Sequence, residues 1–217
     1  MTATARGFVD RYEVFGLRCN PFTAPKRPAA MDFDCERLFV DRGLPDPPTG
    51  HSGTLVQVIG ESGMGKSTQL QQWRRKTPGP FHYIARQPYR DRWASPPPAE
   101  AVGTIYGDEI DRMPKPLRAK WFRSLARAGT TLIIGTHVDL SALGRRCGFT
   151  VTSHYLQPID HETLRQIVDA RLKAFATGST PRLTLSDADI DLVLEESDGI
   201  PGRADVALHC AVAHRVT

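Results

Sequence analysis

Residues 60–68 have the types and spacing needed to bind a phosphate chain. They match the pattern G-x-x-x-x-G-K-S/T at every fixed position. Glycines at 60, 63 and 65 allow a tight loop with positive φ, so that the backbone N–H groups point inward and form an anion nest. Lys66 supplies a positive charge for the β- and γ-phosphates, and Ser67 supplies a hydroxyl for Mg²⁺. The predicted nucleotide-binding residues are Gly60, Glu61, Ser62, Gly63, Met64, Gly65, Lys66, Ser67 and Thr68.

The flanks of this loop favour a nucleotide site over a glycine- and serine-rich turn that happens to contain a lysine. The apolar run 54–59 predicts a buried parallel strand before the loop, and residues 66–76 predict a helix after it. Strand, glycine loop and helix in this order are the context that the motif requires. We therefore expect the chain to bind a nucleoside triphosphate.

Adjacent carboxylates, Asp108 and Glu109, follow a second short apolar run about 40 residues after the loop. At the end of a strand, Asp108 would hold Mg²⁺ directly or through a water, and Glu109 would orient and polarise the attacking water. The alternative is a solvated surface pair. A third apolar run, 130–135, ends in Thr136 and His137, and either side chain could contact the γ-phosphate or the water there.

The positions of these residues imply the elements that must hold them. We expect parallel strands over 54–59, 81–86, 103–107, 130–135 and 149–156, with an irregular proline-rich connection over 87–102. Three helices predict a small C-terminal bundle: one capped by Asp160 that runs to Phe175, one capped by Ser186 with Ile190, Val193 and Leu194 inward, and one over 204–216.

A helix over 115–128 carries Leu117, Trp121 and Leu125 on one face. Its other face is basic, and is either a solvated surface or a site for non-specific DNA or partner contact; its cations are Lys115, Arg118, Lys120, Arg123 and Arg127.

Length and composition bound the architecture. The 217 residues, 40% apolar, suit one α/β domain with a smaller piece: an N-terminal arm over 1–50 packed on the core, a phosphate-loop core over 51–158 and a helical lid over 159–217. Four scattered cysteines without a C-x-x-C pair argue against a zinc site or a disulfide framework and suit the reducing cytoplasm. No stretch resembles a signal peptide or a membrane span, and the net charge of +4 permits contact with a polyanion.

The order of these parts resembles the AAA+ ATPases, and within them the TniB- and MuB-like transposition ATPases and the ExeA-like secretion ATPases. Besides the phosphate loop (Walker A) and YGDEID at 106–111 (Walker B), further segments match in order. They are FGLRCNPF at 15–22, GTH at 135–137, L-x-x-R at 143–146, LQPIDHETLRQIVDARL at 156–172 and GIPGR at 199–203.

The resemblance implies a five-stranded sheet in the order 5-1-4-3-2, Mg-ATP as ligand, and a homo-oligomer that acts on a protein or nucleic-acid partner. It assigns Thr136 or His137 to sensor 1, Arg146 beside Arg145 to a finger on the neighbouring subunit, and Arg203 to the lid's sensor 2. Residues 16–22 would cover the adenine. Three features depart from the family: the proline-rich segment 87–102, Gly202 inserted before the lid arginine, and the lack of the common asparagine at sensor 1.

Two other classes remain open from the residues. One is an ATP-binding adaptor that does not hydrolyse. The other is a GTPase-type switch in which Asp139 reads guanine, since 136–139 faintly matches N-K-x-D or T-K-x-D; however, His137 replaces the lysine and 108–111 lacks D-x-x-G. The client pathway, whether transposition, DNA handling, secretion or signalling, is open as well.

Overall fold

The structure, a computed structural model, describes residues 12, 14–17, 20–22, 42–48, 53–84, 103–178 and 182–216. They form two units. The first spans Arg42–Gln157, and the second combines the described residues before Asp41 with Pro158–Thr217. The predicted proline-rich connection 87–102 lies outside the described residues, as do Cys19 and Cys35.

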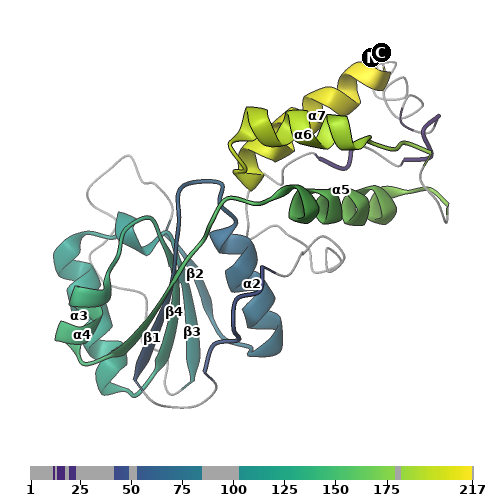
Figure 1. Cartoon of the computed structure of the whole chain (residues 1–217). Helices are drawn as coiled ribbons and strands as arrows, with labels where there is room; N and C mark the ends of the chain where they lie inside the picture. Colours follow the sequence, from purple (N-terminus) through teal and green to yellow (C-terminus); the bar gives the residue numbers. More distant parts are fainter. Residues whose placement is uncertain are drawn as a thin grey trace, which may run out of the picture. The chain divides into compact units, whose positions relative to one another are not determined.

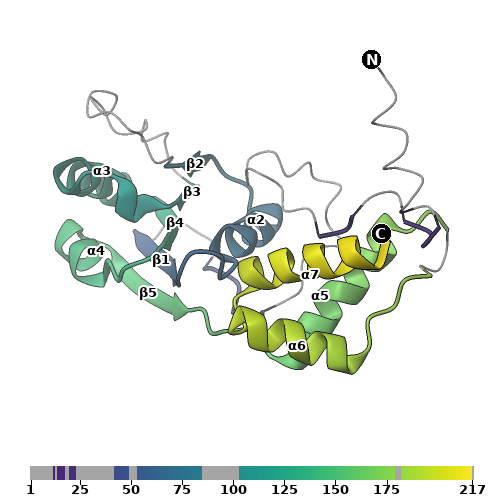
Figure 2. The same ribbon diagram turned by 90° about the horizontal axis from the view of Figure 1, so that it is seen from above.

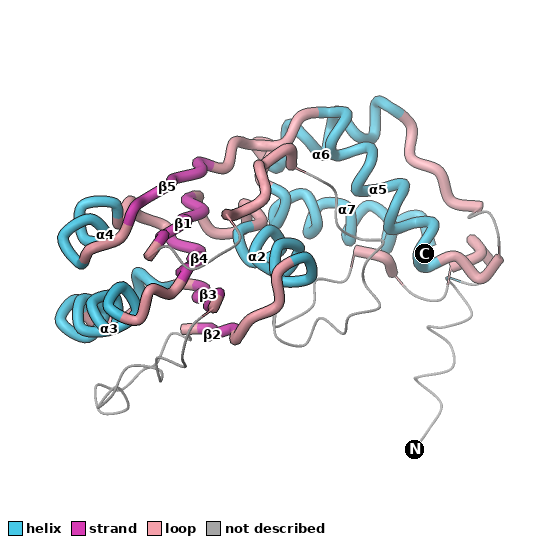
Figure 3. Tube along the Cα trace, turned by 90° about the horizontal axis from the view of Figure 1, so that it is seen from below, coloured by secondary structure: helices cyan, strands magenta, loops and turns pink. Residues whose placement is uncertain are grey.

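The first unit contains a parallel sheet of five strands between layers of helices (Figure 1). Its order, β2-β3-β4-β1-β5, confirms the predicted order. Helix α2 covers one face, while α3 and α4 lie together on the other, as Figure 3 also shows. The elements are β1 (Thr54–Ile59), α2 (Lys66–Lys76), β2 (Phe81–Tyr83), β3 (Thr104–Asp108), η4 (Ile110–Arg112), α3 (Lys115–Arg127), β4 (Thr131–Thr136), α4 (Ser141–Cys147) and β5 (Thr150–Tyr155).

The strand bounds agree with the expected ones to within one residue, except at β2. This strand ends at Tyr83, and residues 85–86, which we expected to continue it, are not described. The core on the α3 and α4 face is closed by Trp121, Phe122 and Leu125 against Leu55 and Leu132 of the sheet. Trp121 and Leu125 confirm the predicted apolar face of α3, to which Phe122 adds.

Strand β1, which lies between β4 and β5, contains a fully buried amide, Gln57. Its Oε1 accepts from the backbone N of Leu140 at 2.9 Å, and its Nε2 lies 2.7 Å from Asp139 Oδ1, 2.7 Å from Ser141 Oγ and 2.8 Å from Ser153 Oγ. These partners belong to the start of α4 and to β5, so one side chain of β1 joins its strand to both segments. A buried amide is stable there because its polar atoms have partners.

The second unit is a helical bundle of α5 (His161–Phe175), α6 (Asp187–Ser197) and α7 (Pro201–Val216), seen from above in Figure 2. Asp160 caps α5 by accepting from Thr163 N, and Ser186 caps α6 in a capping box with Asp189, as predicted. Helix α7 begins at Pro201, three residues earlier than expected, since proline suits a first helical position.

The described residues of the N-terminal arm pack in this helical unit. Tyr12, Leu17 and Phe22 are buried in the same core as Leu164 and Leu208, and Leu17 forms an antiparallel bridge with Ala176. We expected the arm against the phosphate-loop core instead, and only Arg42–Pro48 of its described residues belong to that unit. None of the described helices is long and apolar enough to cross a membrane.

Candidate nucleotide-binding and catalytic site

The phosphate loop connects β1 to α2 at the carboxyl edge of the sheet, where ligands bind in folds of this kind. Gly63 and Gly65 have φ of 87° and 93°, which confirms the conformation predicted for them. Gly60 is different, because its φ is not positive. A Cβ there would lie 3.2 Å from Met64 Cβ and 3.3 Å from Leu156 Cβ, so a side chain at this position would crowd both neighbours.

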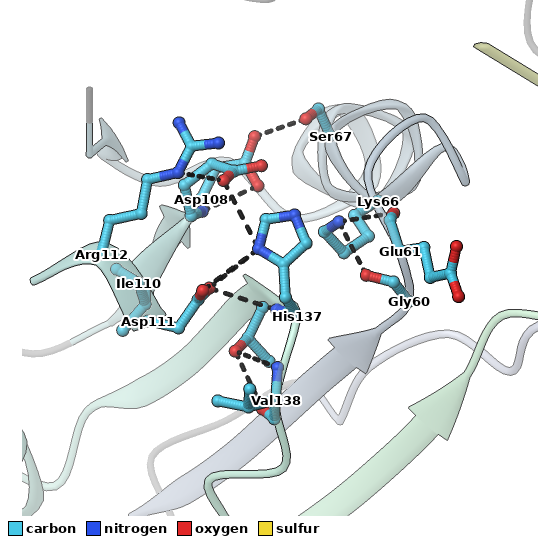
Figure 4. Close-up of polar contacts among 12 residues, drawn as sticks. Gly60, Glu61, Lys66, Ser67, Asp108, Ile110, Asp111, Arg112, His137 and Val138 are labelled. Atoms are coloured by element: carbon cyan, nitrogen blue, oxygen red, sulfur yellow. Dashed lines mark hydrogen bonds and ion pairs between the residues drawn. The ribbon is translucent and has the colours of Figure 1, made fainter. Parts of the chain in front are cut away.

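Lys66, the first residue of α2, points back into the loop. Its Nζ donates to Gly60 O and Glu61 O, both at 2.9 Å, and the residue is 4% exposed (Figure 4). Burial lowers the pKa of this ammonium, and the nearby carboxylates of Glu109, Asp108 and Asp111 oppose the shift. The backbone of the loop thus surrounds a positive charge that is largely shielded from water.

Asp108 ends β3 with a fully buried carboxylate beside this lysine. Its Oδ2 accepts from Ser67 Oγ at 2.5 Å, and its Oδ1 accepts from Glu109 N at 3.0 Å. Burial raises the pKa of Asp108, and the Ser67 hydrogen bond opposes that shift. The structure therefore brings together the two residues predicted to hold Mg²⁺.

A hydroxyl and a carboxylate form an oxygen donor set that fits Mg²⁺. Among the described residues there is no group of three or more His, Cys, Asp or Glu side chains that could cage a metal ion. Mg²⁺ ordinarily keeps several waters and uses one or two protein oxygens together with substrate phosphates, so a two-donor site agrees with this ion.

Gly135 of β4 makes room for the Asp108 carboxylate. A Cβ at Gly135 would lie 2.4 Å from Asp108 Oδ1 and 3.5 Å from Lys66 Cβ. We did not predict this role. The available signal was an isolated glycine within an apolar strand, which often marks a close approach of another group.

Glu109 directly follows β3 in a left-handed conformation, with φ of 59°, which is uncommon for a residue other than glycine. It is 8% exposed. Its Oε2 lies 2.7 Å from Arg112 Nε and 3.6 Å from His137 Nδ1. The predicted base is thus buried at the edge of the site and paired with an arginine that the sequence did not single out.

The two candidates at the end of β4 have different surroundings. Thr136 is fully buried, and its hydroxyl donates to Val138 O at 2.9 Å. The His137 ring instead lies beside Glu109, with Nδ1 at 3.1 Å from Asp111 Oδ2. Of the two side chains, the His137 ring is the one that lies beside the carboxylates of Glu109 and Asp111. Asp111 was not among the predicted site residues.

Arg42, from the segment that precedes the loop, also contacts it. Its Nη1 donates to Met64 O at 3.3 Å and its Nη2 to Gln157 O at 2.5 Å. This side chain ties the phosphate loop to the segment that follows β5. No motif marked it.

The other predicted residues lie on other elements. Arg145 and Arg146 are exposed on α4, which precedes β5 as expected. Arg203 belongs to the helical unit, where its Nη1 donates to Asp198 Oδ2 at 2.7 Å. Leu17 and Phe22, from the segment expected to cover the adenine, are buried in that unit's core, so the adenine role of 16–22 stays a prediction.

The basic face of α3 is smaller than predicted. Lys115, Lys120, Arg123 and Arg127 are exposed, but Arg118 is 6% exposed and donates from Nη1 to Ile110 O and Asp111 O. The prediction that Arg118 belongs to the exposed basic face, whether that face is solvated or a contact surface, was wrong. The carbonyls of η4 lie within its reach, and it stabilises the turn that follows Glu109.

Solved structures are similar to this chain in fold. Two variants of RuvB from Thermotoga maritima align with TM-scores of 0.51 and 0.50, each at 16% identity and over 70% of this chain, covering 53% and 52% of RuvB. The fold is that of a P-loop NTPase. The likeness shows this fold and does not favour the TniB, MuB or ExeA groups. The chain spans about half the length of RuvB, and at this identity the likeness concerns the fold alone.

Sequence comparisons add no family. No protein-family model matches the chain. No curated protein matches it either.

Proposed function

We propose that the chain binds Mg-ATP and hydrolyses it as an AAA+-type ATPase. One observation carries the proposal: a buried lysine inside a phosphate loop, a Ser67–Asp108 oxygen pair and a buried Glu109 meet at the carboxyl edge of the sheet. Together they supply three separate requirements of phosphoryl transfer, namely phosphate binding, ion binding and a base for the attacking water.

The residues divide the work as follows. The loop N–H groups and Lys66 bind the β- and γ-phosphates, and Ser67 with Asp108 would hold the ion. Mg²⁺, when bound, neutralises charge that develops on the transferred phosphoryl group. Glu109 accepts the proton of the attacking water. To do so, its carboxylate must either break its ion pair with Arg112 or bind the water and Arg112 at the same time.

Two substitutions separate binding from chemistry. Lys66→Ala removes the buried charge and should abolish ATP binding, whereas Glu109→Gln should bind ATP normally and lose about 10²–10⁴-fold in turnover. Lys120→Ala and Glu195→Gln make the same changes at exposed positions and should behave as wild type. Isothermal titration and phosphate release measure the two steps. Wild-type turnover in Glu109→Gln would remove Glu109 from the role of base.

The ion pair between Glu109 and Arg112, 2.7 Å long, also favours a second candidate, an ATP-binding adaptor with little turnover. In that case the wild-type chain binds ATP tightly and releases almost no phosphate. Arg112→Ala then distinguishes a restrained hydrolase from an adaptor. A restrained hydrolase gains turnover when the arginine is removed, and an adaptor does not.

The guanine-reading alternative has weaker support. Asp139, its candidate residue, already accepts at Oδ1 from Ser141 N (2.7 Å) and Gln57 Nε2 (2.7 Å), and at Oδ2 from the Tyr155 hydroxyl (3.2 Å). To bind guanine, this carboxylate would have to give up hydrogen bonds to its present partners within the chain. We expect ATP to outcompete GTP in a displacement titration, and the reverse order would favour the switch.

We further propose that the active form is a homo-oligomer in which Arg146 completes a neighbour's site. The motivation is its exposure on α4, just before β5, beside an equally exposed Arg145. Arg146→Ala and Lys66→Ala proteins should each be inactive, and their mixture should regain part of the ATPase activity, since some interfaces then pair an intact loop with an intact arginine. No recovery in mixtures shown to co-assemble would contradict a trans arginine. Arg145 and Arg146 would then be ordinary surface cations.

The exposed cations of α3 are the proposed contact for nucleic acid or an acidic partner. Reversing Lys120 and Arg123 to glutamate should weaken binding to non-specific duplex DNA. The slope of log affinity against log salt should also fall by about 0.9 for each phosphate that is no longer neutralised. Unchanged affinity and slope would mean that this face is an ordinary solvated surface and does not contact DNA.

A further inference from the structure

Asp111 makes a set of contacts to His137 that no motif anticipates. One oxygen, Oδ1, accepts from the backbone N of His137 at 3.1 Å. The ring Nδ1 lies 3.3 Å from Oδ1 and 3.1 Å from Oδ2. Figure 4 shows this carboxylate against the ring edge that carries Nδ1. One side chain of η4 therefore holds both the main chain and the ring at the end of β4.

The charge of Asp111 decides where the imidazole proton lies. An ionised carboxylate can only accept, so the atom that faces it must carry a hydrogen. Burial alone would raise the pKa of Asp111, but hydrogen bonds from the His137 N–H and ring hold it below its usual value, so the carboxylate stays ionised. The Glu109 carboxylate, at 3.6 Å from the same Nδ1, favours the same placement.

With Nδ1 protonated, Nε2 of the neutral ring is an acceptor. In Figure 4 this nitrogen lies on the ring edge away from Asp111, on the side drawn toward Lys66 and Ser67. The other charged groups near the ring are Glu109, its partner Arg112, and Lys66, whose ammonium interacts electrostatically with Glu109 and Asp111. A lone pair at Nε2 suits an O–H donor such as water and does not suit a phosphate oxygen.

We propose that Asp111 is a positioning residue that fixes His137 in the Nδ1–H tautomer, so that Nε2 accepts a hydrogen bond from the attacking water. This inference rests on the proposed hydrolysis. The water then has two acceptors. Glu109 takes the proton that leaves, and His137 holds the second O–H so that the oxygen lone pair faces phosphorus. The carboxylate–imidazole arrangement follows the general logic by which a third group orients a histidine.

The tautomer is tested first without nucleotide. Long-range ¹H–¹⁵N spectra of the full chain at pH 8 should show His137 with protonated Nδ1 and unprotonated Nε2, and loss of its signals in His137→Gln assigns it among the seven histidines. Asp111→Asn, which can donate as well as accept, should move the ring toward the Nε2–H form. Asp191→Asn is the matched control, because it alters a solvent-exposed contact with His161 (3.5 Å) and should leave His137 unchanged.

Kinetics then test the consequence. Asp111→Asn should lower kcat by about 10²–10⁴-fold while the KM for ATP changes little, since the Asp111 carboxylate contacts His137 and is not part of the phosphate loop. A wild-type Nε2–H tautomer, or a tautomer unchanged by Asp111→Asn, overturns the positioning role whether or not the chain hydrolyses ATP. The predicted tautomer in a protein without any turnover would instead refute the proposed hydrolysis and, with it, the water contact. A rise in the KM for ATP together with a fall in kcat would point to a merely structural effect of Asp111.

Discussion

Replacing Gly135 by alanine tests whether Asp108 is held in the position that a metal ion requires. The added Cβ would lie 2.4 Å from Asp108 Oδ1, and real Cβ atoms essentially never approach closer than 3.0 Å. The carboxylate must therefore move by at least 0.6 Å, the difference between these two distances. It is fully buried and bonded to Ser67 Oγ and Glu109 N, so it cannot move without disturbing both.

The expected effect follows from this displacement. A misplacement of about 1 Å at a reacting centre can cost about 10²-fold, so we expect Gly135→Ala to lower turnover roughly 10- to 100-fold and to raise the Mg²⁺ concentration needed for half-maximal activity. The assay is phosphate release over a Mg²⁺ titration at saturating ATP. Nucleotide affinity without Mg²⁺ should change much less, because the loop and Lys66 Nζ are not displaced.

Gly144→Ala supplies a matched control in the same unit. Its Cβ would lie 2.5 Å from Leu55 Cδ2 and 2.9 Å from Val151 Cγ2, a similar clash in apolar surroundings. Overpacking there should lower the free energy of unfolding by about 1–3 kcal/mol without altering the Mg²⁺ dependence. If Gly135→Ala shows the wild-type Mg²⁺ requirement and rate, Asp108 does not hold the ion from this position, and the reasoning fails.

Three further predictions concern stability and pH. Ser186→Ala should lower the free energy of unfolding by about 1 kcal/mol in thermal melts, because the α6 cap is lost, and an unchanged melt would mean the cap is replaced by water. Arg118→Ala should cost about 1–3 kcal/mol in urea titrations, since two carbonyls after β3 lose their donor, whereas Lys120→Ala should be neutral; equal effects would contradict the burial difference. The pKa of Asp139 is lowered to about 2, chiefly by hydrogen bonds from the Ser141 side chain and backbone. The stability that this ionised carboxylate gives to the folded state is therefore fully present above pH 3.8, its ordinary pKa, and is lost as the pH falls through about 2. In a plot of the free energy of unfolding against pH, Asp139→Asn should reduce the fall at acid pH. An unchanged fall would refute the assignment.

The part of the site that could be predicted is the part that is local in sequence. Gly63, Gly65, Lys66 and Ser67 lie within five consecutive positions, so their spacing alone specifies a loop and the start of a helix. Asp108 was predictable because a carboxylate at the end of an apolar run must reach the carboxyl edge of a parallel sheet. The sheet order came from the resemblance, since hydrophobic runs alone do not say which strands are neighbours.

The rest depends on contacts between segments far apart in the chain. Nothing near Arg42 in the sequence indicates Met64, and nothing near Gly135 indicates Asp108, because these distances are set by strand register and loop path. Arg118 illustrates a different limit. Its spacing placed it on the polar face of α3, but the carbonyls of η4 offered partners that made burial stable, and periodicity carries no information about partners.

The buried amide of Gln57 connects the strand that leads into the phosphate loop with the helix that carries Arg145 and Arg146. Gln57 stands three residues before Gly60 on the strand that leads directly into the phosphate loop, and it bonds Leu140 N and Ser141 Oγ at the start of α4. Arg145 and Arg146 are carried on that short helix. In the proposed homo-oligomer, a neighbouring subunit that displaces α4 would also displace, through Gln57, the strand that leads into the phosphate loop. Gln57→Leu would fill this position with an apolar side chain and remove these hydrogen bonds, so that α4 and the phosphate loop would no longer be connected through it.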